Sequence, residues 1–156
     1  MKIKEVNAIS QYLRQVTNDL YFNDDIKIIT NSYAMLKFNS NKEYLQVKEN
    51  LKQFKKVIFN KSSIDLKQVY NMLLDKEYQI NNNVFKEKIL NNVVVNIDYN
   101  DLHLSYQLRI NKLLEVFKIA SCESSQDFTV NRLFFRELKE VEFIIASSIA
   151  DYSDVM

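Results

Sequence analysis

The chain contains no glycine and no proline, and this double absence constrains its fold more than any other feature of the sequence. Average composition would give 156 residues roughly eleven glycines and eight prolines. Every turn must therefore be built without the residue that enters positive φ freely. Asparagine occurs 18 times and tolerates positive φ better than most residues, so we expect asparagine and aspartate to occupy the turns.

The same absence excludes several classes of chemistry. Phosphate-binding loops, the dinucleotide fingerprint, the kinase loop and the nucleophile elbow all use glycine where backbone must turn sharply or approach a ligand. The calcium-binding loop also depends on glycine. Thiolate or histidine zinc sites need at least two ligands of a kind, whereas Cys122 and His103 are each the single residue of their type. We therefore expect no cofactor, no structural zinc and no enzymatic activity.

Length and composition predict one globular domain spanning residues 1–156. Apolar residues make up 47% of the chain, enough for a sizeable core in a domain of this length. The lone Cys122 favours a reducing compartment, and we expect a cytoplasmic protein with no membrane partner. The 17 lysines against 4 arginines, with abundant asparagine, are typical of an AT-rich genome, such as that of a low-GC bacterium, its phage or its plasmid.

The first half of the chain predicts helices around one hairpin. Val6, Ile9, Leu13, Val16 and Leu20 recur at helical spacing, which predicts a helix over 3–22. Two strands are expected on either side of Asn31-Ser32, giving an antiparallel hairpin near 26–38. The capping-box residues Ser40 and Glu43 predict a helix over 41–59, and a further helix is expected after Ser62-Ser63.

The second half predicts a short helix over 84–90, a second hairpin near 93–110, and two more helices. Strict alternation of apolar and polar residues over 102–110 favours a strand. Helices are then expected over 111–122 and 129–150. The predicted fold class is α+β, with about five or six helices and two antiparallel β-hairpins, with a single sheet as an option.

The leading functional hypothesis arises from the expected final helix. Its apolar residues sweep an arc of roughly 200°, wider than one core contact needs, while Phe143 falls among charged residues and should be exposed. Central burial of the helix is the alternative reading. A partner-facing helix predicts a small non-enzymatic interaction protein, an inhibitor or adaptor encoded by a mobile element, which binds another protein or itself. The candidate interface residues are Phe135, Phe143, Arg132, Arg136 and Lys139.

An alternative function arises from lysines in the expected helix 41–59. These residues gather on one side of that helix, as in proteins that follow a phosphate backbone: Lys42, Lys48, Lys52, Lys55 and Lys56. Lysine-rich helix faces are more often simply solvated, and the net charge of the chain is only +1. Nucleic-acid binding is therefore the second hypothesis.

Carboxylates at the hairpin ends give a third hypothesis, a metal-dependent nuclease. Asp24 and Asp25 precede the first hairpin, and Asp98 and Asp101 flank the turn of the second. Such groups can hold Mg²⁺, although aspartate in a turn commonly serves the turn itself. A nucleophilic pair of Cys122 and His103 would require the two side chains to meet in space.

Overall fold

The computed structural model describes residues 1–15, 17–61, 65–80, 89–90, 93–97, 104–107, 111–126 and 130–150. The helices are α1 (Ile3–Arg14), α2 (Asn41–Lys52), α3 (Leu66–Leu74) and the single turn α4 (Asn111–Leu114). The strands of the first half are β1 (Asp19–Asn23), β2 (Ile28–Thr30), β3 (Ala34–Phe38), β4 (Ile58–Lys61) and β5 (Tyr78–Ile80). Those of the second half are β6 (Ile89–Leu90), β7 (Val93–Ile97), β8 (Leu104–Gln107), β9 (Ile119–Ser125), β10 (Val130–Phe135) and β11 (Val141–Ala150).

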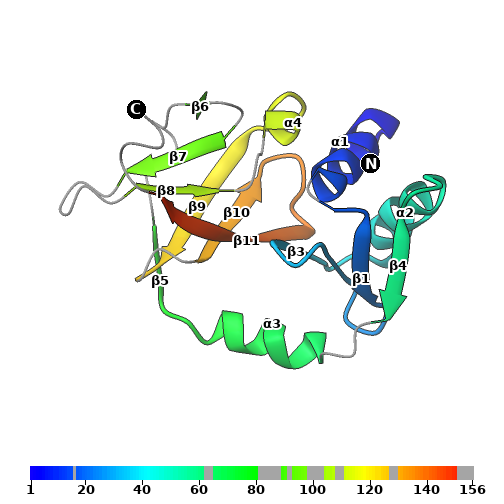
Figure 1. The fold of residues 1–156 in the computed structure, drawn as a ribbon, viewed down its shortest axis with the longest axis horizontal. Helices are drawn as coiled ribbons and strands as arrows, with labels where there is room; N and C mark the ends of the chain where they lie inside the picture. Colours follow the sequence, from blue (N-terminus) through cyan, green and yellow to red (C-terminus); the bar gives the residue numbers. More distant parts are fainter. Residues whose placement is uncertain are drawn as a thin grey trace.

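A mixed sheet organises the molecule, with strand order β4-β1-β2-β3-β11-β10-β9-β5. Strands β1 and β4 are parallel, and the other neighbours on this path are antiparallel. The long β11 runs through the centre, where its first half lies between β3 and β10. Its second half pairs with β8, which carries β7 and β6 beside it. Strand β11 therefore joins the two groups of strands (Figure 1).

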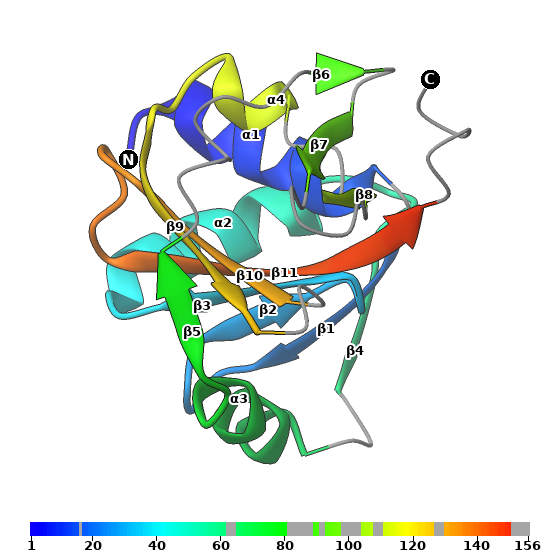
Figure 2. The same ribbon diagram turned by 90° about the vertical axis from the view of Figure 1, so that its left-hand side faces the viewer.

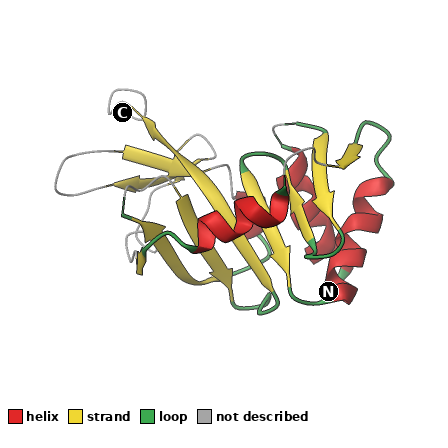
Figure 3. Cartoon of the chain, turned by 90° about the horizontal axis from the view of Figure 1, so that it is seen from below, coloured by secondary structure: helices red, strands yellow, loops and turns green. Residues whose placement is uncertain are grey.

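Helices cover the two faces of the sheet unequally. Helices α1, α2 and α4 lie together on one face, and α3 lies alone on the other (Figure 2). Seen from below, α3 crosses the strands diagonally (Figure 3). The face under α1, α2 and α4 is called the major face here, and the face under α3 is called the minor face.

The major face holds the main hydrophobic core. Side chains from both long helices, from α4 and its following turn, and from the central strands meet there, and most are fully buried. The aromatic rings of Tyr12, Phe135 and Phe143 pack edge to face, with Phe135 and Phe143 centroids 5.0 Å apart. The minor face buries a smaller cluster around Ile28, Met35, Leu66, Val130 and Ile144. Folding free energy from apolar burial therefore comes mainly from the major face.

Each of the three longer helices begins where a side chain satisfies free backbone N–H groups. The Glu5 carboxylate accepts the N–H of Lys2 at 2.7 Å at the start of α1. Ser40 accepts the N–H of Glu43 at the start of α2, as its capping-box sequence predicted. Asp65 caps α3 by accepting two backbone N–H groups, whereas the sequence pattern had favoured Ser62-Ser63.

The expected helices of the first half are shorter than predicted, because strands replace their second halves. Helix α1 ends at Arg14, and Asp19–Asn23 form β1 instead of continuing the helix to residue 22. Helix α2 ends at Lys52, and the chain turns so that Ile58–Lys61 form β4 beside β1. Leu20 is fully buried in β1, and it would also be buried on the apolar face of a helix, so helical spacing alone could not distinguish a strand from a helix here.

The prediction of helices over 111–122 and 129–150 is wrong. Only Asn111–Leu114 are helical in the first segment, which then enters β9, and the second segment forms the β10–β11 hairpin. Both faces of β10 and β11 are covered by helices and each face buries apolar residues, so the strict alternation of a half-buried strand is missing. Leu138 is buried in the turn between β10 and β11, so an apolar residue continued the helix-like spacing of apolar residues across that turn.

The fold-class prediction of five or six helices with two hairpins is therefore wrong. The two expected segments do pair antiparallel: Ile29 lies opposite Leu36 in β2–β3, and Asn96 lies opposite Ser105 in β7–β8. Both pairs, however, are parts of a larger mixed arrangement that continues into β1, β4 and β11. Most of the helix expected over 84–90 lies outside the described residues, and Ile89–Leu90 form β6. The molecule is α+β, with strands dominating the second half.

Asparagine was expected to take positive φ in the turns of this glycine-free chain, but it supports them in another way. Among the described residues, positive φ occurs at Lys27 (57°) and Ser32 (75°), not at asparagine or aspartate. Asparagine instead supports the turns through its side chain. The Asn23 oxygen accepts the N–H groups of Asp25 and Ile26, and the buried Asn31 oxygen accepts those of Tyr33 and Ala34.

None of the helices in the described part of the chain has both the length and the apolar character required to cross a membrane.

Candidate functional site

A β-bulge distorts the β9–β10 hairpin close to the turn that leads to β11. Phe134 lies opposite Ser121 and Phe135 lies opposite Ile119, so the register skips Ala120. Pairing continues beyond the bulge, where the Arg136 N–H donates to the Lys118 carbonyl at 2.9 Å. A bulge bends its strand and redirects side chains, and bulges often occur beside functional sites.

A depression with a volume of about 610 Å³ lies at this bulge, and we call it the β9–β10 depression. Its lining is Ala120, Ser121, Phe134, Phe135, Arg136, Leu138 and Lys139. The volume falls within the range of roughly 300–1,000 Å³ that is usual for ligand sites. The small side chains of Ala120 and Ser121 stand where larger ones would fill the space across from Phe134.

The turn after β10 places charge at the rim of the depression and apolar groups in its lining. Leu138 is 2% exposed and packs into the core of the major face, which anchors the turn. The Leu138 N–H donates to the Phe135 carbonyl, and the Val141 N–H donates to the Leu138 carbonyl. Arg136 and Lys139 on either side of this anchor are exposed. The turn therefore presents two cations beside apolar side chains.

The structure brings three of the five predicted interface residues to this depression: Phe135, Arg136 and Lys139. The expectation that Phe143 is exposed is wrong, because its side chain is 0% exposed and packs against Tyr12 and Phe135 in the major-face core. Helical geometry had grouped Phe143 with charged residues, whereas strand alternation turns it inward. Phe143 cannot contact a partner in the folded chain.

Arg132, the fifth predicted interface residue, lies on the minor face and is bound within the chain. Its Nε donates to Glu142 at 2.6 Å, its Nη2 also contacts Glu142, and its Nη1 lies 3.3 Å from Glu123. Glu142 further accepts the Tyr70 hydroxyl at 2.9 Å, which ties α3 to β11. Sequence reasoning missed these partners, although acids and bases on neighbouring strands would have suggested them once the strands were known.

Burial shifts the pKa of two groups near this cluster. Burial, followed by the hydrogen bond to Glu142, raises the pKa of the Tyr70 hydroxyl to about 12. Burial lowers the pKa of the Lys37 amine, and the charge of Lys27 adds to that effect, while Glu142 opposes it. Lys37 lies opposite Glu142 on β3, so a row of alternating charge crosses four strands. The row comprises Lys37, Glu142, Arg132 and Glu123. Arg132 binds both Glu142 and Glu123, whereas the Lys37 amine donates to the Phe38 carbonyl and to Asn39, so each of these groups has a partner, which is typical of a structural network.

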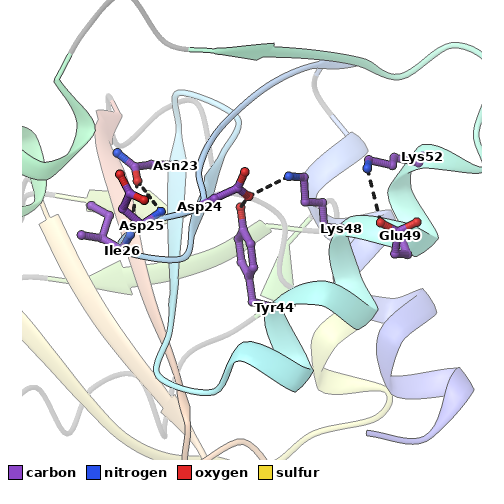
Figure 4. Close-up of polar contacts among 8 residues, drawn as sticks. All are labelled: Asn23, Asp24, Asp25, Ile26, Tyr44, Lys48, Glu49 and Lys52. Atoms are coloured by element: carbon purple, nitrogen blue, oxygen red, sulfur yellow. Dashed lines mark hydrogen bonds and ion pairs between the residues drawn. The ribbon is translucent and has the colours of Figure 1, made fainter.

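The lysines of the second hypothesis do not form one basic face. Lys48 is only 8% exposed, and its Nζ lies 2.7 Å from Asp24 and 4.0 Å from the centroid of the Phe22 ring. Figure 4 shows Asp24 between Lys48 and Tyr44, whose hydroxyl donates to the same carboxylate oxygen at 2.6 Å. This contact fastens α2 to the turn after β1.

The remaining lysines of that set are exposed, and Lys52 has an ion-pair partner. Lys52 lies 3.3 Å from Glu49, its neighbour on α2. Lys42 stands exposed in the first turn of α2, and Lys55 and Lys56 stand exposed in the turn before β4. Three exposed lysines at separate ends of one element make a weaker phosphate track than the five predicted.

The hydrogen bonds of Asp24 also bear on the metal hypothesis. The Lys48 and Tyr44 hydrogen bonds lower the pKa of the Asp24 carboxyl, so the group is ionised but already bound by two donors. No cluster of three or more histidine, cysteine, aspartate or glutamate side chains suited to a metal occurs in the described ranges. Asp98, Asp101 and His103 lie outside those ranges, so the carboxylates of the second hairpin and the Cys122–His103 pair fall outside the described residues. Cys122 itself is fully buried on β9.

The β9–β10 depression therefore combines a cavity, a backbone irregularity and exposed charge at one place. The Asp24 and Arg132 clusters, by contrast, consist of groups that already bind one another. Comparison of the chain with protein families, with curated proteins and with solved structures finds no match.

Proposed function

We propose that this protein acts by binding another protein, as an inhibitor or adaptor, and that the β9–β10 depression receives an apolar side chain of the partner. The observation that carries the proposal is the convergence of the half-buried Phe134 with the exposed Arg136 and Lys139 on one depression of about 610 Å³. Protein interfaces are typically anchored by an apolar or aromatic side chain in a pocket, with arginine enriched nearby. The lone buried Cys122 fits a cytoplasmic setting for this activity.

The neighbouring groups support binding rather than catalysis at this place. Among the described side chains that line the depression, none is a carboxylate, imidazole or thiol. General acid–base chemistry usually employs such groups. The lining offers apolar contact, two cations and one hydroxyl, from Ser121. These groups suit recognition of a folded or extended partner segment.

Site-specific photo-crosslinking tests the proposal. A photoreactive benzoylphenylalanine replaces Lys139 at the depression or, as a matched control, the exposed Lys42 on α2. We expect the label at position 139 to capture one protein from cells of the source organism, and the Arg136→Glu variant to abolish that capture. The captured protein must then bind purified wild-type chain directly in calorimetry.

Equal capture from both label positions, or no direct binding afterwards, would contradict the proposal. Capture of a second copy of this chain at position 139, with a dimer in light scattering, would replace the heterologous partner with self-association. Nucleic acid remains the second hypothesis. Its test is loss of oligonucleotide binding between about 50 and 200 mM salt.

A further inference from the structure

The charged side chains that line the β9–β10 depression are both positive, and this carries an inference about the partner. Two cations, Arg136 and Lys139, belong to the lining, and no acidic side chain does. Within the described part of the chain neither cation forms an ion pair. Exposed cations are normally solvated, so their position beside an apolar surface is what makes them informative.

The carboxylates of the same turn do not belong to the lining. Glu137 lies between Arg136 and Lys139 in sequence, and its Oε2 accepts the Lys118 backbone N–H at 3.1 Å. Glu140, which follows Lys139, is exposed and is not part of the lining either. The lining of the depression therefore presents two cations that a carboxylate-bearing ligand can bind.

We propose, on the basis of the function proposed above, that the partner segment is an acidic peptide with one large apolar side chain flanked by carboxylates. The apolar side chain packs in the depression against Phe134, Ala120 and Ser121. The carboxylates meet Arg136 and Lys139, where the planar guanidinium of Arg136 can bind a carboxylate through two parallel hydrogen bonds.

A peptide fits the depression better than a nucleic acid does. Single-stranded nucleic acids bind by stacking bases on exposed aromatic faces. Phe134 is the half-buried aromatic of the lining, and the Arg132 guanidinium already lies 5.4 Å from the centroid of its ring. Phe135 is 2% exposed and packed against Phe143 and Phe117, so its ring is also unavailable for stacking. An apolar side chain needs no free aromatic face, so this lining favours apolar insertion over base stacking.

Selection from a random peptide library displayed on phage tests this inference on the full-length protein. We expect enriched peptides to contain a phenylalanine, leucine or tryptophan next to two or more acids. Synthetic copies of these peptides should bind the Arg136→Glu/Lys139→Glu double variant at least tenfold more weakly than wild type. The matched double variant Lys55→Glu/Lys56→Glu makes the same change in net charge elsewhere and should bind as wild type does.

A second variant separates this inference from the proposed function. Ala120→Trp should fill the depression and abolish binding of any peptide that enters it, with circular dichroism and a thermal melt confirming the fold. Peptides that need the open depression but lack acids, and that tolerate the double charge reversal, would overturn the acidic partner while keeping the proposed function. An absence of enriched peptides, or binding unaffected by Ala120→Trp, would overturn both. Displacement of the peptides by a single-stranded oligonucleotide, with oligonucleotide binding lost in the same variants, would reassign the depression to nucleic acid.

Discussion

The two faces of the sheet differ in what holds their covering helices in place. On the major face, α1, α2 and α4 rest on a continuous apolar core that includes Tyr12, Phe135 and Phe143. On the minor face, α3 rests on a smaller apolar cluster and on a charged network in which Tyr70 binds Glu142. The same strands β10 and β11 supply both faces, with residues alternating between them.

This difference separates the groups that stabilise the fold from those available for binding. Apolar burial is roughly proportional to area and dominates the free energy of folding, so the major face should carry most of the stability. Charged groups on the minor face offset their own desolvation by binding each other. The β9–β10 depression lies at the end of the β9–β10 hairpin, and its cations, Arg136 and Lys139, belong neither to the apolar core nor to the charged network of the minor face.

The largest expected effect is on the major face. Phe143→Ala should lower the free energy of unfolding by about 3–5 kcal/mol, because it leaves a cavity among fully buried rings. Phe134→Ala should cost less, because Phe134 is only half-buried at the depression. Urea unfolding of both variants measures the difference. A larger loss for Phe134→Ala would reverse the assignment of core and surface on β10–β11.

The next effect concerns the minor face. Glu142→Ala should lower the free energy of unfolding by about 2–3 kcal/mol, because it removes the carboxylate that Arg132 and Tyr70 share. Tyr70→Phe removes a single hydrogen bond and should cost only about 1 kcal/mol. Equal losses in thermal unfolding would show that the network does not depend on Glu142.

A pH-dependent effect is expected at the ion pair on the major face. Hydrogen bonds from Lys48 and Tyr44 lower the pKa of Asp24 in the folded state, so its contribution is present above its unfolded pKa of about 3.9. That contribution is lost as the pH falls through the folded pKa, because the unfolded state then binds the proton more readily.

Asp24→Asn should accordingly destabilise the protein by at most about 1 kcal/mol at pH 7, since the carboxylate is 57% exposed. The difference from wild type should shrink as the pH falls below about 4. Asp25→Asn, the exposed neighbour, serves as the control and should change little. A difference that grows toward acid pH would contradict the assigned role of Lys48 and Tyr44.

The smallest effect lies in a turn that belongs to neither face. Ser32 has a φ of 75°, which strains a residue with a Cβ atom. Ser32→Gly should therefore raise the free energy of unfolding by up to about 1 kcal/mol, reduced by the greater freedom of glycine in the unfolded chain. Ser32→Ala retains the Cβ atom and should show no such gain. Differential scanning calorimetry distinguishes the two outcomes.

Sequence patterns correctly predicted features that depend on residues close together in the chain, such as a helix start or a hairpin. Ser40 located the start of α2 correctly, because an N-cap side chain that accepts the Glu43 N–H acts within one turn of chain. A further helix was expected after Ser62-Ser63, and α3 forms there, where Leu66, Val69, Tyr70 and Leu73 line the minor face together. The prediction of antiparallel pairing in β2–β3 likewise rested on neighbouring residues.

The candidate site was predicted only in part. Arg136 and Lys139 were named for the wrong reason, since a helix was expected there, but their exposure follows from their charge in either structure. Ala120, Ser121 and Leu138 were missed because a bulge depends on how two strands align, and small residues give no signal of it. Phe143 was misplaced because its direction depends on a period of two rather than 3.6 residues.

The sequence by itself determined that turns must form without glycine or proline, that one apolar core is available, and that glycine-loop chemistry is absent. Only the tertiary structure decided that residues 130–150 form two strands rather than one helix. The physical reason is that helices cover both sides of β10 and β11, so apolar residues of these strands are buried on both faces, beside the charged Arg132 and Glu142. Without strict alternation, such a pattern fits a buried strand and a buried helix equally, and only the contacts made by distant segments distinguish the two.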